Sequence, residues 1–378
     1  MSRIEELIKE KCPNGVGYRT LDKVCKINKG KQLNKDGLLS DGLYPVINGG
    51  ITPSGYWNEY NYNENLITIS QGGASAGYIA YQLTKFWAGA HCYVIENCED
   101  DIVYRYLYHF LKNKEKDLQS TQVGAGIPSV SLKEIYGLKI PVPPIEVQEE
   151  IVKVLDKFGE LEAELEAELE ARKSQYEFWR AELLNKNNNN YKKYNITEIC
   201  KSISAGGDVP KDTIKGISKP QDEYKYPVIS NGVGDNAIYG YSKNYRVDVQ
   251  SCVTIAARGT IGYHEVRYGK FTPIIRLITL IPDEKIVSAK YLHYALYGHE
   301  FKTSGGSIPQ LTTPTVKQLD LIIPPLEEQE RIVAILDKFE ELTNDMVNGL
   351  PAEIKLRRKQ YEYYRNKLLS FEELNISE

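Results

Sequence analysis

The side chains best suited to contacting another molecule lie on two glycine-rich segments, residues 71–77 and 257–262. The first reads QGGASAG and presents Gln71, whereas the second reads ARGTIG and presents Arg258. A glutamine amide matches the edge of adenine, and an arginine guanidinium matches the edge of guanine. The first segment lacks the glycine spacing of a dinucleotide-binding loop, and a mononucleotide loop is the weaker alternative for it. We interpret both segments as tight turns between strands that carry base-reading side chains.

Lysines on neighbouring loops have the chemistry to hold phosphate groups, which gives affinity without sequence choice. A single surface lysine is more often a solvated charge, so each is a candidate only in this context. The predicted DNA contacts are Lys29, Lys31, Lys35, Ser70, Gln71 and Lys85 in the first half of the chain, and Lys211, Lys215, Lys243, Arg258 and Lys270 in the second.

Catalytic and metal-binding motifs are missing from the sequence. There is no P-loop, and the two Pro-Pro pairs follow Val142 and Ile323, so neither forms the Asn-Pro-Pro-aromatic motif of amino-methyltransferases. Residues 353–355 match part of a nuclease Glu-x-Lys pattern, but they lie in a helical segment. The six cysteines form no Cys-x-x-Cys pair, so we expect free thiols rather than a zinc site. We predict no catalytic residue and no bound metal.

Charge is unevenly distributed along the 378 residues, although the net charge is only −4. Residues 146–184 hold 12 acidic and 5 basic residues, whereas residues 185–325 hold 12 acidic and 18 basic residues. The local field, rather than the overall charge, decides where a polyanion docks. The sequence shows neither an apolar run long enough to cross a bilayer nor a signal-peptide pattern, so we expect a cytoplasmic protein.

The chain repeats itself in tandem. PPIEVQEEIVKVLDKF at residues 143–158 returns as PPLEEQERIVAILDKF at 324–339, and RKSQYEFWRAELL at 172–184 returns as RRKQYEYYRNKLL at 357–369. Weaker landmarks keep the same order in both halves, such as YPVINGG at 44–50 and YPVISNG at 226–232. The order is therefore domain, helix, domain, helix.

Each repeated block predicts a long helix that begins at a Pro-Pro pair, because proline suits the first turn of a helix. Apolar residues recur at three- and four-residue steps, which marks one helical face that needs a partner. We predict that the two helices pack as an antiparallel coiled coil, with an interruption near Pro351 in the second. The predicted packing residues are Ile151, Leu155, Phe158, Leu161, Leu165, Ile332, Leu336, Phe339, Leu342 and Met346.

The predicted fold class is α+β, with two mixed, strand-rich domains separated by two long helices in a pseudo-twofold tandem repeat. Domain boundaries are placed at residues 1–142, 143–186, 187–323 and 324–378. Short apolar or β-branched runs predict strands near 66–70, 92–96, 252–256 and 274–281. One helix per domain is expected, near 103–113 and 289–303.

The repeated motifs PPIEVQEEIVKVLD and PPLEEQERIVAILD, with CPNGV at residues 12–16, resemble the specificity subunits of type I restriction-modification systems. The resemblance covers the whole chain. It implies a non-catalytic DNA-binding protein with two target-recognition domains, one for each half of a split double-stranded DNA site. It also implies two modification subunits and restriction subunits as partners, which would carry S-adenosylmethionine and ATP, while this chain binds no cofactor.

Two other functions remain alternatives. A coiled-coil adaptor for protein interaction would use the helices for assembly and show no DNA specificity. An enzyme, either a fused methyltransferase or a nuclease, would show turnover with cofactor and DNA, but the motifs for it are missing.

Overall fold

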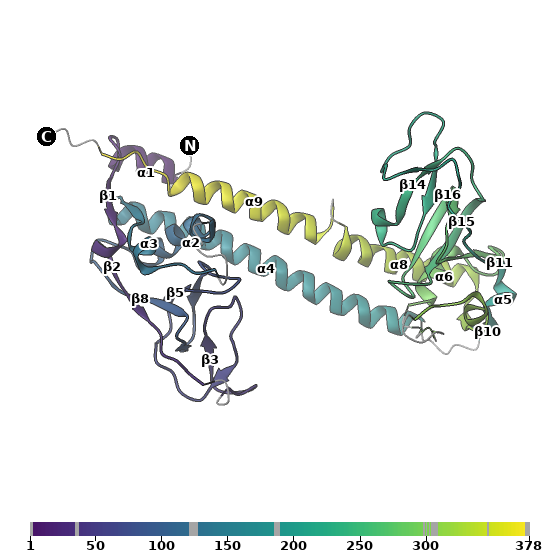
Figure 1. The fold of residues 1–378 in the computed structure, drawn as a ribbon, viewed down its shortest axis with the longest axis horizontal. Helices are drawn as coiled ribbons and strands as arrows, with labels where there is room; N and C mark the ends of the chain where they lie inside the picture. The colour runs from purple at the N-terminus through teal and green to yellow at the C-terminus, as the bar shows by residue number, and fades with distance from the viewer. Residues whose placement is uncertain are drawn as a thin grey trace. The chain divides into compact units, whose positions relative to one another are not determined.

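A computed structural model of the chain describes residues 3–34, 38–120, 128–184, 190–297, 299, 301, 303, 309–345 and 348–374. The chain forms two compact units, each described here by itself (Figure 1). The first unit comprises Met1–Glu166 and Glu353–Glu378, and the second comprises Ala167–Ala352. Each unit thus contains a strand-rich domain and parts of the long helices. Lys35 and Met346 lie outside the described residues.

The domain of the first unit is built on a four-stranded sheet of order β2-β8-β5-β6. A three-stranded sheet, β4-β3-β7, and a pair, β1-β9, complete it. Its elements are α1 (Arg3–Lys11), β1 (Gly17–Thr20), η1 (Leu21–Lys23), β2 (Cys25–Lys29), β3 (Tyr44–Ile47), β4 (Tyr56–Trp57), β5 (Leu66–Ser70), β6 (Ile79–Gln82), β7 (Trp87–Ala88), β8 (Cys92–Cys98), α2 (Tyr104–Ser120), α3 (Leu132–Tyr136) and β9 (Lys139–Val142).

The domain of the second unit has a seven-stranded sheet of order β11-β17-β15-β16-β13-β14-β12 and a pair, β10-β18. Its elements are β10 (Lys192–Asn195), α5 (Ile196–Ile199), β11 (Cys200–Ala205), β12 (Ile214–Lys215), β13 (Tyr226–Ile229), η3 (Gly234–Ala237), β14 (Ile238–Ser242), β15 (Val247–Ala256), β16 (His264–Pro273), β17 (Leu277–Pro282), α6 (Ala289–Ala295), α7 (Thr313–Val316) and β18 (Asp320–Ile323).

The two domains share one topology, which confirms the tandem repeat. Strands β2-β8-β5-β6 of the first domain correspond to β11-β17-β15-β16 of the second, all paired antiparallel. The terminal pairs β1-β9 and β10-β18 also correspond. In both domains a further strand joins in parallel, β3 on β7 and β13 on β16. The duplicated sequence therefore folds twice into the same frame.

The predicted secondary structure is confirmed in its main elements, but the bounds of two predicted elements are wrong. The strand predicted near 274–281 begins only at Leu277, because Ile274–Leu277 forms a turn closed by a 3.2 Å bond from the Leu277 N–H to the Ile274 carbonyl. Arg276 lies in this turn with a φ of 77°. The helix predicted to reach residue 303 ends at Ala295. Periodicity finds an apolar run but not the turn inside it.

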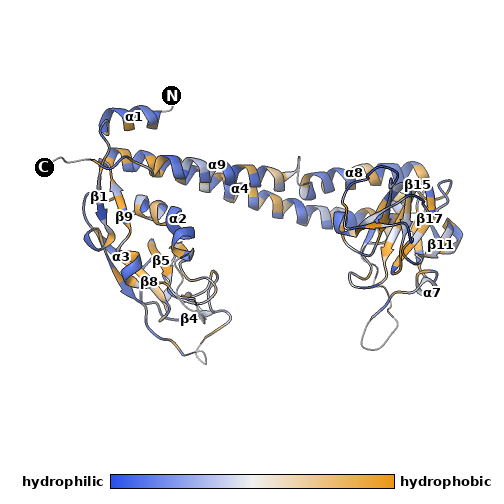
Figure 2. Ribbon diagram, turned by 45° about the horizontal axis from the view of Figure 1, so that its top comes forward, coloured by the Kyte–Doolittle hydropathy of each residue, from blue (hydrophilic) through white to orange (hydrophobic). Residues whose placement is uncertain are grey.

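The long helices are α4 (Ile145–Leu184), α8 (Leu326–Asn344) and α9 (Leu350–Leu368). In the first unit Phe158 of α4 stacks on Tyr364 of α9 with ring centroids 5.4 Å apart. In the second unit Tyr176 of α4 lies 6.0 Å from Phe339 of α8. Hydrophilic and hydrophobic residues alternate along α4 and α9 (Figure 2). None of the described helices is long and apolar enough to span a bilayer.

Four residues predicted to join helix to helix lie in the domain cores instead. Ile151 and Leu155 belong to the cluster that holds the apolar residues of β5, β8 and α2. Ile332 and Leu336 occupy the matching cluster of the second domain. Phe158 and Phe339 face the opposite helix, while Leu161 and Leu165 are only half-buried and Leu342 remains 37% exposed. The first turns of α4 and α8 are thus parts of the domains, which explains the strength of their apolar stripe.

The interruption predicted near Pro351 is confirmed, but the helix ends before the proline. α8 ends at Asn344, and Pro351 is the second residue of α9, where its missing N–H has no helical partner to lose. Gly349 packs against the end of α8: a Cβ there would lie 2.5 Å from the carbonyl oxygen of Glu341. The sharp break therefore depends on the glycine, and the proline starts the next helix.

Candidate nucleic-acid interface

Three loops of the first domain meet where β3 and β5 end and β8 begins. They comprise residues 48–54, 71–77 and 89–91, together called loop cluster 1. The Gln71 N–H donates to the His91 carbonyl at 2.8 Å, and the His91 N–H donates to the Asn48 side-chain oxygen at 2.9 Å. The Ser70 hydroxyl donates to the Gly49 carbonyl at 2.8 Å. The three loops therefore form one connected surface.

The second domain holds the equivalent loop cluster 2, residues 230–237, 257–263 and 274–276. The Ala257 N–H donates to the Arg276 carbonyl at 2.8 Å, which repeats the bond between Gln71 and His91. The Thr260 hydroxyl donates to the Asn231 carbonyl at 2.9 Å and joins the loop of residues 257–263 to that of residues 230–237. The backbone frame of the two clusters is thus the same.

The glycine-rich segments of both clusters are tight turns between antiparallel strands, as predicted. In the first, the Gly77 N–H donates to the Ser70 carbonyl at 2.8 Å; in the second, the Gly262 N–H donates to the Ala256 carbonyl at 2.9 Å. Both glycines have a φ of 84°, a conformation that residues with a Cβ rarely adopt. The glycines serve the backbone and leave the other loop residues to present side chains.

The side chains on this shared frame differ between the clusters. Loop cluster 1 carries Gln71 and His91, whereas loop cluster 2 carries Arg258 and Arg276. The Gln71 side-chain oxygen is buried and has no hydrogen-bond partner among the described residues. His91 and Arg276 were not among the predicted contacts, although each follows a Lys-Phe pair, residues 85–86 and 270–271, by five residues. One frame therefore carries two different sets of polar groups.

Residues 13–171 and 188–356 each match the family model of the type I restriction modification DNA specificity domain. The chain belongs to this family. A putative specificity subunit of Mycoplasma pneumoniae is 35% identical over 82% of this chain and 95% of its own length. A putative type I restriction enzyme specificity subunit of Haemophilus influenzae is 32% identical over 94% and 96%. The crystal structure of the S subunit from M. genitalium shares the fold, with a TM-score of 0.62, 18% identity and 94% and 96% coverage.

Two of the lysines proposed for this specificity subunit lie beside loop cluster 1. The backbone of Lys31 donates to the Ala88 carbonyl at 2.8 Å, and Lys29 faces Tyr93 across the β2–β8 ladder. Both side chains are exposed. Lys85 is elsewhere: its ammonium lies 3.3 Å from the Tyr60 hydroxyl. Of the predicted lysines that the structure describes, Lys29 and Lys31 are therefore those that the fold brings to the cluster.

The lysines of the second domain are mostly engaged away from loop cluster 2. Lys243 pairs with Glu223, Lys270 lies 3.6 Å from Asp248, and Lys215 lies over the ring of Tyr239. Lys211 is exposed in the segment between β11 and β12. The contacts described for these side chains do not include loop cluster 2, whose own loops carry Arg258 and Arg276.

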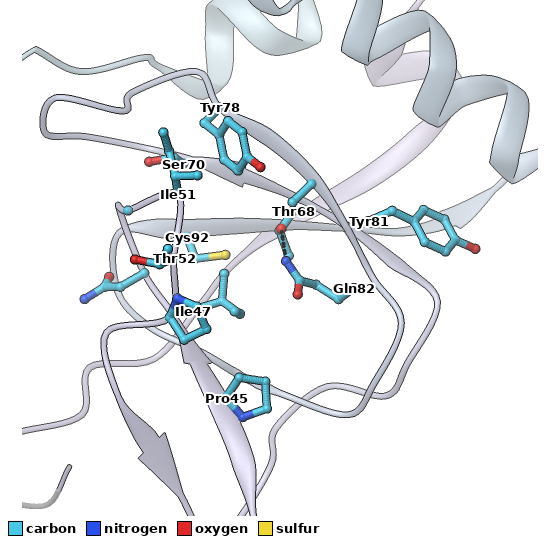
Figure 3. A pocket seen from close by; sticks show the side chains of 14 residues that line it. Pro45, Ile47, Ile51, Thr52, Thr68, Ser70, Tyr78, Tyr81, Gln82 and Cys92 are labelled. Atoms are coloured by element: carbon cyan, nitrogen blue, oxygen red, sulfur yellow. Dashed lines mark hydrogen bonds between the residues drawn. The ribbon is translucent and has the colours of Figure 1, made fainter. Parts of the chain in front are cut away.

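A cavity of about 160 Å³ lies against residues 48–54 of loop cluster 1 (Figure 3). Thr68 and Gln82 line it and are joined by a 2.9 Å bond from the glutamine amide to the threonine hydroxyl. Ser70 also lines the cavity and is only 4% exposed, and its hydroxyl donates to the Gly49 carbonyl. Ser70 thus holds the loop to β5, and we leave it out of the DNA-contacting surface.

One thiol lies beside loop cluster 1. Cys92 lines the cavity, but burial raises the pKa of its thiol to about 12, so the thiol stays protonated and is a poor nucleophile near neutral pH. Within the described ranges, no group of three or more His, Cys, Asp or Glu residues is arranged to hold a metal ion. The candidate site therefore offers hydrogen-bond donors and acceptors on a fixed frame.

Proposed function

We propose that this specificity subunit reads a bipartite double-stranded DNA target, with one half-site on each loop cluster. The main observation in support of this proposal is that the duplicated backbone frame carries different side chains, Gln71 and His91 in one copy and Arg258 and Arg276 in the other. Two equivalent frames with different polar groups suit two different base sequences. Lys29 and Lys31 add phosphate contacts beside loop cluster 1.

The chain itself performs no chemistry in this proposal. Modification subunits supply S-adenosylmethionine and adenine methylation, restriction subunits supply ATP-driven translocation and cleavage, and this chain binds no cofactor. The protonated thiol of Cys92 and the lack of nucleotide-loop motifs in the sequence support a recognition role.

Two modification subunits would dock on equivalent exposed aromatic residues of the long helices. Phe178 on α4 is 60% exposed, and Tyr363, its counterpart on α9, is 61% exposed. Each packs edge-on against its neighbour, Trp179 or Tyr364, with centroids about 5.5 Å apart (5.5 and 5.4 Å). Large exposed aromatic side chains are typical anchors of protein interfaces. Two copies of the anchor favour two copies of one partner.

The experiment is methylome sequencing of a host with the native chain, without it, and with residues 18–142 exchanged for another first recognition domain. We expect one bipartite methylated motif, its loss on deletion, and a chimera in which one half-site changes while the other half-site and the spacer stay the same. A change in both half-sites would contradict one domain per half-site. An adaptor would leave the motif unchanged and show no salt-sensitive DNA binding in the assembled complex.

A further inference from the structure

Arg276 has a backbone conformation that its residue type does not favour. Among the described residues, the non-glycine residues with positive φ are Asn65, Asn97, Asp222 and Arg276. Asparagine and aspartate tolerate this region, because their short polar side chains bond locally, whereas a long side chain gains no such compensation. An arginine at a φ of 77° is therefore held there against its own preference.

The fold needs the backbone of this residue, not its side chain. The Arg276 carbonyl accepts the Ala257 N–H at 2.8 Å and so ties the turn before β17 to the loop that carries Arg258. Glycine would make the same bond without strain. The Arg276 side chain is exposed, and among the described residues no ion pair or side-chain hydrogen bond engages its guanidinium. The contacts of the described residues thus do not account for an arginine here.

The position is matched in the other repeat, where the His91 carbonyl accepts the Gln71 N–H at 2.8 Å. His91 is not among the residues with positive φ. Arg258, in turn, matches Gly72, because both directly follow the residue whose N–H makes this bond. Loop cluster 2 therefore carries two arginines at positions that hold histidine and glycine in loop cluster 1.

We propose that Arg276 is a specificity-determining residue that reads a guanine in the second half-site, next to the base pair contacted by Arg258. This rests on the proposed function. A guanidinium donates two hydrogen bonds to the O6 and N7 atoms of guanine, a pattern that no other base presents in the major groove. The strained turn and its bond to Ala257 fix the backbone from which the side chain extends, so less conformational entropy is lost on binding.

The test compares Arg276→Gly, Arg276→Lys and the control Asn65→Gly in the complete complex with its modification subunits. Asn65 also has a positive φ, 64°, but lies at the opposite end of β5 from loop cluster 1. Binding and methylation are measured on the native target and on targets with each base pair of the second half-site replaced. Thermal unfolding of each variant identifies any loss of folding.

Arg276→Gly is expected to unfold no earlier than the native chain and to lose at least about fivefold preference for guanine at one position of the second half-site. The first half-site should be unchanged. Arg276→Lys should keep the salt dependence of binding yet weaken the guanine preference, because an ammonium on a flexible stem lacks the rigid planar pair of donors that a guanidinium presents. The Asn65→Gly variant should show the same base preferences as the native chain in both half-sites.

The inference is overturned if Arg276→Gly weakens all sequences equally and lowers the salt slope while Arg276→Lys restores both, since that is phosphate contact alone. Unaltered specificity in Arg276→Gly overturns it as well. In both cases a native complex that still reads two half-sites leaves the proposed function standing. A native complex without sequence preference would contradict both this inference and the proposed function.

Discussion

At the scale of single residues, a buried histidine pair supports loop cluster 2. His264 begins β16 directly after the loop of Arg258, and its Nδ1 lies 2.9 Å from Nδ1 of His293 on α6. Burial lowers the pKa of His264 to about 3, helped by repulsion from His293, and burial lowers that of His293 to about 4. Among the described residues, the other titratable or charged groups near the pair are Arg180, Lys290, Tyr294, Tyr297, His299 and Asp337. Both imidazoles are therefore neutral at pH 7.

This pair predicts a loss of stability in mild acid. An unfolded histidine has a pKa of about 6.5, so below that pH the unfolded chain binds protons that the folded chain does not. Stability is full above about pH 6.5, and one such imidazole accounts for a loss of about 2 kcal/mol between pH 7 and pH 5. His264→Asn should flatten the pH dependence of thermal unfolding, while exposed His91→Asn should leave it steep. Parallel curves for native chain and His264→Asn would refute the role of the pair.

At the scale of elements, one buried glutamine ties the start of each long helix to its domain. The Gln148 amide nitrogen donates to the carbonyls of Asp101 and Pro143, each at 2.8 Å, and its oxygen accepts the Val103 N–H at 2.9 Å. Gln148 is fully buried, and its three partners lie just before α2 and α4. The glutamine in the PPIEVQEE motif thus satisfies backbone groups that neither helix can satisfy itself.

The second copy repeats this arrangement. The Gln329 amide donates to the carbonyls of Ile286 and Pro324 at 2.8 and 2.9 Å, and its oxygen accepts the Ser288 N–H at 3.0 Å. The Pro-Pro pairs predicted where the helices begin, whereas the role of the glutamine was not predicted from the sequence. The repeated helix motif therefore encodes a junction as well as a helix.

Replacing either glutamine with leucine should destabilise its own unit by about 2–4 kcal/mol, because buried backbone groups lose their partners. Hydrogen exchange is the measurement: Gln148→Leu should speed exchange at the start of α2, and Gln329→Leu at the start of α6. Glu149→Ala and Glu330→Ala are the control variants, at exposed positions directly after the glutamines on the same helices, and should change stability by less than about 0.5 kcal/mol. Equal protection in the leucine variants and the native chain would show that the junction does not depend on these bonds.

At the scale of the whole molecule, the chain passes between the units twice, and the two passages differ. One lies within α4, which is unbroken over its 40 residues (Figure 1). The other lies at Ala352 and Glu353, shortly after the break between α8 and α9. A continuous helix has a fixed rise per residue, whereas a broken one can bend. If the protein fixes the spacing of two half-sites, α4 is the element suited to do it.

Ala167→Pro tests this role. Proline in the middle of α4 costs about 3 kcal/mol and kinks the helix, so methylome sequencing should find targets with more than one spacer length. Ala167→Gly costs about 1 kcal/mol without the clash and should keep a single spacer. A proline variant that methylates at the native rate with one unchanged spacer would exclude α4 as the ruler.

The sequence by itself determined the features that depend on local chemistry. The tandem order, the helix starts at Pro-Pro, the break near Pro351 and the glycine turns at 71–77 and 257–262 all follow from motifs of a few residues. Short-range preferences of proline, glycine and apolar spacing act on neighbouring residues, so they can be read without the fold. The family resemblance, based on the same repeated motifs, is confirmed.

Only the tertiary structure decided which residues meet. In the structure Ser70 is buried, and Arg276 lies beside the loop of Arg258. Ile151 and Leu155, predicted to pack between the two long helices, lie in a domain core. These outcomes depend on hydrogen bonds between strands and loops that are distant in sequence, such as the bond from Ala257 to Arg276. Such a bond forms only when the sheet is assembled, because no short-range preference of either residue specifies the other as its partner.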